Sequence, residues 1–164
     1  MTIDGREFRN AMGLFATGVT VVTSGKAPKF HGMTANAFSS ISLDPPLVLV
    51  CVDKHTHMLE VLQETGAFSV NFLAADQQGT SNYFANSDRP HDETEFADID
   101  YTIGSTGMPR INGAICVIDC LVHSVTDAGD HDVYIGEVKA METTPDADPL
   151  LFFGGGYRAL APKS

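Results

Sequence analysis

Residues 47–52 read LVLVCV, a continuous apolar run that directly follows two prolines. A run of this length, rich in Val and Leu, is typical of a strand buried on both faces, because an edge strand or amphipathic helix would include polar positions. Other short apolar or β-branched runs predict further strands at 19–23, 30–33, 68–73, 114–126 and 133–141. We therefore expect a mainly β chain, an antiparallel barrel or sandwich with a few short helices.

Turn and helix signals lie between these runs. A turn with Gly and Pro predicts a hairpin between the first two strands, and DAGD at 127–130 predicts one between the last two. Apolar residues at helical spacing within 4–15 predict an amphipathic helix that Gly18 ends. A second helix is expected to begin at Thr56, whose hydroxyl can cap it, and to stop at Gly66.

The rest of the sequence shows no internal repeat and no long linker, so residues 1–164 are expected to form one domain. Residues 76–84 are polar and predict a short helix, and 85–100, rich in Asp, Glu and Pro, predict a long acidic loop. A loose tail is expected at 161–164.

The charge of the chain excludes several classes of partner. Ten Lys and Arg oppose twenty-one Asp and Glu, which gives a net charge of -11. Such a surface repels nucleic acid and anionic lipid, although a local pocket can still bind a phosphorylated small molecule. No apolar segment is long enough to span a membrane and the first residues do not resemble a secretory signal, so we expect a cytoplasmic protein. We expect its three cysteines to be reduced and buried: Cys51, Cys116 and Cys120.

Small and hydroxyl residues at 32–42, GMTANAFSSIS, form the first candidate site. Backbone amides and short side chains can approach a flat polar ligand closely there, and Asn36 and Ser39 are the residues of most interest. A serine-rich strand on a solvated face explains the same residues.

The second candidate site is DKHT at residues 53–56, between a buried strand and a helix start. Lys54 is the only Lys or Arg between Lys29 and Arg89, and a helix N-terminus favours an anion. A solitary lysine at such a place suggests phosphate binding. The alternative is a helix cap beside a solvent-exposed lysine.

Two further segments could contact a ligand. His131 follows Gly129 and Asp130 in the predicted turn, where an imidazole can donate or accept a hydrogen bond, although a turn histidine is often only a surface residue. Residues 152–158, FFGGGYR, place aromatic rings beside three glycines, which suits a planar ligand or equally a packed terminal strand.

Familiar catalytic motifs are absent from the sequence. It has no dinucleotide-binding glycine fingerprint, phosphate-binding loop, zinc-protease motif or nucleophile elbow. His55 and His57 lack a third ligand at suitable spacing, so no metal is expected. If the chain is an enzyme, a cofactor is expected to supply its reactive group.

Taken together, these segments resemble the flavin reductase family over nearly the whole chain. The resemblance rests on the order and spacing of six motifs: FATGVTVVT from Phe15, GMTANAF from Gly32, SLDPPLV from Ser42, FSVNFL from Phe68, GDH from Gly129 and PLLF from Pro149. It implies an FMN-binding split barrel that forms a homodimer with flavin near the subunit interface.

The resemblance also implies roles for individual residues. His131 matches a family histidine that faces the flavin and the nicotinamide, and replacing it should impair flavin reduction without releasing flavin. The implied cofactor-binding residues are those at the ring and ribityl chain, at the phosphate and at the closing side of the pocket: Thr34, Ala35, Asn36, Ala37, Ser39 and Ser40; Asp53, Lys54 and Thr56; Phe152 and Tyr157. The phosphate segment departs from the family pattern because it is shorter and richer in histidine.

The implied activity is NAD(P)H-dependent reduction of FMN or FAD, with reduced flavin passed to a separate flavin-dependent monooxygenase. A flavin-retaining electron carrier or sensor without NAD(P)H turnover, and a flavin-free interaction module, are the alternatives. The sequence leaves FMN and FAD equally open. NADH is favoured over NADPH, because the acidic loop offers no arginine cluster for a 2′-phosphate.

Overall fold

The computed structural model describes residues 3–161. It contains three short helices, α1 (Gly5–Met12), α2 (His57–Thr65) and α3 (Gln78–Ala85). The strands are β1 (Thr17–Gly18), β2 (Thr20–Lys26), β3 (Lys29–Ala35), β4 (Phe38–Leu43), β5 (Pro46–Asp53), β6 (Ala67–Phe72), β7 (Tyr101–Ile103), β8 (Pro109–Ile111), β9 (Cys116–Ala128), β10 (His131–Thr143), β11 (Leu151–Phe153) and β12 (Gly156–Arg158). The predicted mainly β class is confirmed, and so are both predicted hairpins.

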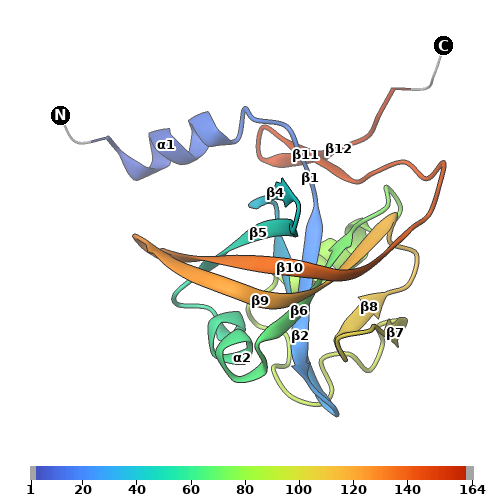
Figure 1. The fold of residues 1–164 in the computed structure, drawn as a ribbon. Helices are drawn as coiled ribbons and strands as arrows, with labels where there is room; N and C mark the ends of the chain where they lie inside the picture. Colours follow the sequence, from blue (N-terminus) through green and yellow to red (C-terminus); the bar gives the residue numbers. More distant parts are fainter. Residues whose placement is uncertain (1–2, 162–164) are drawn as a thin grey trace.

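Seven strands form one antiparallel sheet in the order β3-β2-β6-β9-β10-β5-β4 (Figure 1). Its two edge strands, β3 and β4, are joined by only Asn36 and Ala37, so the edges approach each other at that point. A three-stranded sheet of β1, β11 and β12 and the β7–β8 hairpin complete the strands.

The sheet has a core on each face, and β2 contributes to both. Val22 packs in a cluster with Met58 and Leu62 of α2, whereas Val21 packs in a second cluster with Phe84 of α3 and Phe96. Alternate side chains of a strand point to opposite faces. The run of buried residues in β2 therefore reflects coverage of the sheet on both sides.

Strand β5 differs from its prediction. Its side chains alternate, with Val48, Val50 and Val52 buried but Leu49 and Cys51 only half-buried. It is an inner strand, paired with β10 and β4, yet one of its faces lines a cavity instead of a packed core. Burial on both faces was therefore the wrong interpretation of the apolar run.

The helix boundaries also refine the predictions. Gly13 ends α1, and Gly18, expected to end it, lies in β1. Thr56 precedes α2 without capping it, because its hydroxyl donates to the Asp53 carbonyl at 2.7 Å. Gly66 stops α2 as predicted, in the left-handed conformation that glycine adopts readily.

Segment 85–100 contains turns, as an irregular loop should, but parts of it are buried. No described helix is long and apolar enough to cross a bilayer. Of the predicted tail, residues 162–164 lie outside the described part of the chain.

Candidate functional site

A pocket of about 450 Å³ opens where the two sheet edges meet. The β3–β4 link forms one side, and the corner between β5 and α2 forms another. Antiparallel pairing of β10 with β5 sets His131 opposite Asp53, and the Cys51 amide donates to the Ala37 carbonyl at 3.1 Å. Strand register thus assembles the pocket from segments far apart in the sequence.

Seven of the residues predicted to bind flavin or nicotinamide line this pocket: Thr34, Ala35, Asn36, Ala37, Asp53, Thr56 and His131. Five others are not among its lining residues: Ser39, Ser40, Lys54, Phe152 and Tyr157. The roles of all twelve in binding stay predictions. Their different positions nevertheless decide which of them can contact a ligand in this pocket directly.

The two serines lie on the exposed edge strand β4, where the Ser39 hydroxyl donates to the Ser40 carbonyl. Phe152 and Tyr157 pair in the β11–β12 hairpin with ring centroids 5.6 Å apart. The Tyr157 hydroxyl is 2.8 Å from Ser81 Oγ, and the carbonyl of Ser81 accepts from Thr34 at 2.7 Å. Tyr157 therefore supports the pocket wall through α3.

Lys54 directly follows β5, and its side chain contacts the turn between β9 and β10. Its ammonium donates to the Asp127 carboxylate and, at 2.7 Å, to the Gly129 carbonyl, while its backbone amide donates to Asp130. The hydrogen bond to Asp127 raises the pKa of Lys54 above its ordinary value. The lysine is thus engaged in fixing the turn that carries His131.

His131 is held by its neighbour in sequence. Its Nδ1 lies 2.7 Å from Asp130 Oδ1, and this hydrogen bond lowers the pKa of the aspartate. With Nδ1 facing the carboxylate, Nε2 is the nitrogen available to a ligand. Cys51 also lines the pocket, and burial raises the pKa of its thiol, so it is a poor nucleophile.

A buried network that no sequence motif indicates lies behind the pocket wall. Glu95, 1% exposed, accepts from His31 Nδ1 at 2.7 Å, from the Gly32 amide at 3.0 Å and from Arg89 Nε at 3.0 Å. Burial raises the pKa of Glu95, but these donors outweigh it and the net shift is downward. Arg89 also donates to the Gly32 carbonyl and approaches His31 Nε2 at 3.4 Å, which defines His31 as the neutral Nδ1–H tautomer.

The pocket is poor in carboxylates for so acidic a chain. Asp53 is the only carboxylate among the described residues that line it. Five of the six histidines of the chain line it as well: His31, His55, His57, His91 and His131. No sequence motif announces this gathering, because the histidines come from a strand, a helix start, a loop and a turn. Among the described residues, no group of three or more His, Cys, Asp or Glu side chains is arranged to hold a metal ion.

A second, mostly apolar cavity of about 770 Å³ adjoins the first, and both are lined by Asn36, Ala37 and Cys51. Met12 and Phe15, at the end of the N-terminal helix segment, also line it. The two cavities together offer a polar end and an apolar end to one ligand.

The donor set of this site suits a flavin. Imidazoles, hydroxyls and strand-end amides complement a phosphate and the polar edge of the ring, and the apolar cavity complements its hydrocarbon edge. A comparison with known proteins agrees with this fit. Residues 12–161 match the family model described as the flavin reductase like domain, and the chain belongs to the flavin reductase family.

Several characterised relatives are similar over almost the whole chain. An NADH-dependent FAD reductase of Streptomyces globisporus is 40% identical over 98% of this chain and 88% of its own length. The reductase subunit HsaB of a flavin-dependent monooxygenase from Rhodococcus jostii is 38% identical, covering 98% and 80%. The structure of BorF, the flavin reductase component of a bacterial two-component tryptophan halogenase, superimposes with a TM-score of 0.92 at 42% identity, covering 98% and 100%.

Proposed function

We propose that this protein catalyses NADH-dependent reduction of flavin and supplies the reduced flavin to a separate monooxygenase. The observation that carries the proposal is the pocket where the sheet edges meet. It gathers imidazoles in a strongly acidic chain, and it occurs in a fold of the flavin reductase family. Relatives with this fold are named as NADH-dependent flavin reductases and as components of two-component systems.

Each side of the pocket has a role in this proposal. The Thr34–Ala37 side binds the flavin ring and ribityl chain. The corner of His55, Thr56 and His57 binds the phosphate, because Lys54 is occupied at the neighbouring turn. Phe152 and Tyr157 do not line the pocket in this proposal; Phe152 packs on Tyr157, which supports the pocket wall through Ser81 of α3.

When bound, flavin accepts a hydride from reduced nicotinamide, so the protein contributes mainly proximity and alignment. His131 orients the reactants through Nε2, and Asp130 fixes the imidazole from its other side. Lys54 holds the turn in place. No acid or base of the chain needs to transfer a proton in the hydride step.

NADH is favoured over NADPH because the arginine that lines the pocket already uses its hydrogen-bond donors within the protein. Arg89 is the only Arg or Lys among its described lining residues, and its donors are already used by Glu95, Gly32 and Asn86. A 2′-phosphate would therefore meet no available guanidinium.

We also propose that the chain forms one domain, with its sheet completed as the split barrel of the family, and that it works as a homodimer. Helix α1 stands apart from the sheet with no buried residue, and Phe8, Met12 and Phe15 are 54%, 54% and 76% exposed (Figure 1). Exposed apolar area of this kind marks an interaction surface. A second copy covering it would also close the apolar cavity that Met12 and Phe15 line.

Light scattering coupled to size-exclusion chromatography tests the homodimer, and a mass of one chain would refute it. A cytoplasmic location completes the proposal and is supported by the three free cysteines, since reduced thiols persist in that compartment.

The decisive experiment mixes the protein with NADH or NADPH and free FMN or FAD, and follows nicotinamide absorbance. Rapid oxidation that requires added flavin, faster with NADH, is the expected result. Bound flavin without oxidation would instead indicate an electron carrier or sensor. Absence of flavin binding would indicate an interaction module and refute the proposal.

A further inference from the structure

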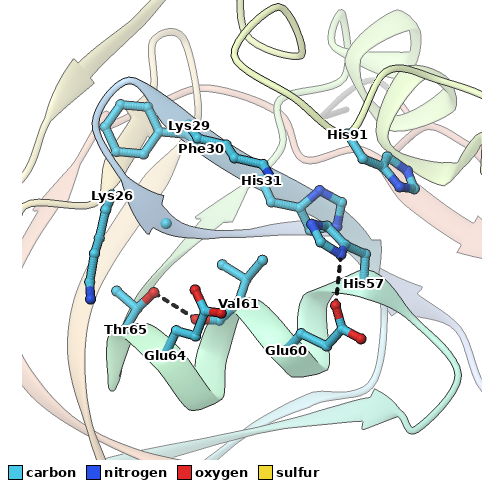
Figure 2. A pocket seen from close by; sticks show the side chains of 11 residues that line it. Lys26, Lys29, Phe30, His31, His57, Glu60, Val61, Glu64, Thr65 and His91 are labelled. Atoms are coloured by element: carbon cyan, nitrogen blue, oxygen red, sulfur yellow. Dashed lines mark hydrogen bonds and ion pairs between the residues drawn. The ribbon is translucent and has the colours of Figure 1, made fainter.

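Three imidazoles meet on the wall between the pocket and a smaller cavity of about 260 Å³ beside α2 (Figure 2). His31, His57 and His91 line both spaces. His57 belongs to the corner proposed to bind the flavin phosphate. The other two rings lie against it, so they can determine how its imidazole is oriented toward a ligand.

Only one nitrogen of His57 is left for an anion in the pocket. Its Nδ1 lies 3.3 Å from the Glu60 carboxylate (Figure 2), so Nε2 is the nitrogen that can contact a phosphate. Such a contact depends on the orientation of the ring. The Glu60 side chain is 74% exposed, and an ion pair with an exposed carboxylate contributes little to holding the ring. The imidazole therefore needs a further support.

His31 supplies a rigid surface against that ring. It meets His57 edge to face, a favoured arrangement of aromatic rings, with centroids 4.9 Å apart and an interplanar angle of 80°. His91 stacks on His57 at 5.3 Å but is itself exposed, whereas His31 is only 4% exposed. His31 is therefore the neighbour whose position is fixed by the interior of the protein.

Glu95 anchors His31 from that interior. Its carboxylate accepts from His31 Nδ1 at 2.7 Å, and His31 Nε2 lies 3.4 Å from Arg89 Nη2. Both nitrogens of His31 are thus used within the protein, and neither is available to a ligand. Burial lowers the pKa of His31, so its ring stays neutral and adds no charge to the pocket. What His31 contributes to the pocket is the position of its ring.

We propose that His31 is a positioning residue: held by Glu95, its ring orients the His57 imidazole so that Nε2 meets the phosphate of a bound flavin. This inference rests on the proposed function, which places the phosphate at the corner of His55, Thr56 and His57. The support comes from β3 and from the loop before β7, both distant in sequence from that corner.

The test measures dissociation constants for FMN and for riboflavin, which lacks the phosphate, by flavin fluorescence or calorimetry. Their ratio, the preference for FMN, isolates the contribution of the phosphate, because a general loss of pocket structure weakens the binding of both ligands. His57→Ala should reduce this preference roughly tenfold, the scale of a lost hydrogen bond to a charged group. His123→Ala, at an exposed histidine of β9 that does not line the pocket, is the matched control and should leave the preference unchanged.

Two substitutions of His31 separate its ring from its hydrogen bond. His31→Asn keeps a donor for Glu95 but removes the ring, and it should reduce the preference roughly threefold, since a loosened His57 still reaches the phosphate part of the time. His31→Phe keeps a ring but loses the donor, and it should retain most of the preference. An unchanged preference in His31→Asn would overturn the inference, because the bond to Glu95 would then be all that matters.

A double-mutant cycle shows whether the effect of His31 passes through His57. In the His57→Ala background, His31→Asn should leave the preference for FMN unchanged, because the ring that His31 orients is gone. An equal reduction in both backgrounds would overturn the inference, whatever the result for His31→Phe. If His57→Ala alone leaves the preference unchanged, the proposed phosphate corner is wrong and the inference falls with it. Wild-type protein that binds neither flavin would refute the proposed function itself, so the failures are distinguishable.

Discussion

Replacement of Glu95 tests the buried network behind the pocket most directly. The Glu95 side chain is fully buried, and Arg89, its ion-pair partner, has only 6% of its side chain exposed. In Glu95→Ala the guanidinium stays buried without its counter-charge, and the His31 and Gly32 donors lose their acceptor. Breaking one side of a buried pair typically costs about 3–5 kcal/mol, which is a large share of the roughly 5–15 kcal/mol that stabilises a domain.

The assay is urea unfolding followed by circular dichroism, with the free energy of unfolding taken from linear extrapolation. Glu95→Gln retains one acceptor and should lose less stability than Glu95→Ala. The control is Glu142→Ala, which removes the exposed partner of Arg110 and should cost less than about 1 kcal/mol. If Glu95→Ala also loses less than about 1 kcal/mol, the network does not stabilise the fold and the reasoning fails.

Four further predictions concern catalysis, the β9–β10 turn, packing and pH. His131→Ala should raise KM for NADH or slow flavin reduction in stopped-flow measurements while flavin stays bound; unchanged kinetics would contradict its role. Lys54→Ala should lower the rate of flavin reduction more than the affinity for FMN, because the lysine holds the turn that carries His131. A large loss of FMN affinity would instead show that Lys54 binds the flavin phosphate. Gly136→Ala should cost about 1–3 kcal/mol in urea unfolding, since its Cβ would lie 2.4 Å from Phe68 Cζ, and wild-type stability would refute this close approach. Burial lowers the pKa of His31 below 6.5, so the unfolded state binds the proton first as pH drops. The free energy of unfolding should therefore fall as pH drops through 6.5. His31→Asn should make this dependence of stability on pH less steep, and an unchanged dependence would exclude His31 as its source.

Local patterns were enough to predict most elements of the sheet. The β-branched and apolar runs mark β2, β5, β6, β9 and β10, and Gly66 marks the end of α2, because these signals depend on neighbouring residues only. The burial of β5 was misjudged because the sequence alone does not distinguish an apolar residue that lines a cavity from one that packs in a core.

The site was predictable in its parts and not in its assembly. The pairing of His131 with Asp53 depends on β10 lying next to β5, a partnership that no local signal encodes. Glu95 sits in a segment whose acidic composition predicts a solvated loop, yet Arg89 and His31 draw it into the interior. Only the resemblance to a family grouped the separate motifs into one site.

The histidines that line the pocket determine how it can bind an anion. Arginine is permanently charged, and Arg89, the one arginine among the described residues that line the pocket, is already paired with Glu95. The proposed phosphate corner therefore relies on the imidazoles of His55 and His57 and on the Thr56 hydroxyl, within a chain of net charge -11. Such a site attracts an anion locally without binding it as tightly as paired guanidinium groups would. Moderate affinity is what a reductase requires if flavin is a substrate that must leave after reduction, and a carrier that retains its flavin would gain from the opposite arrangement.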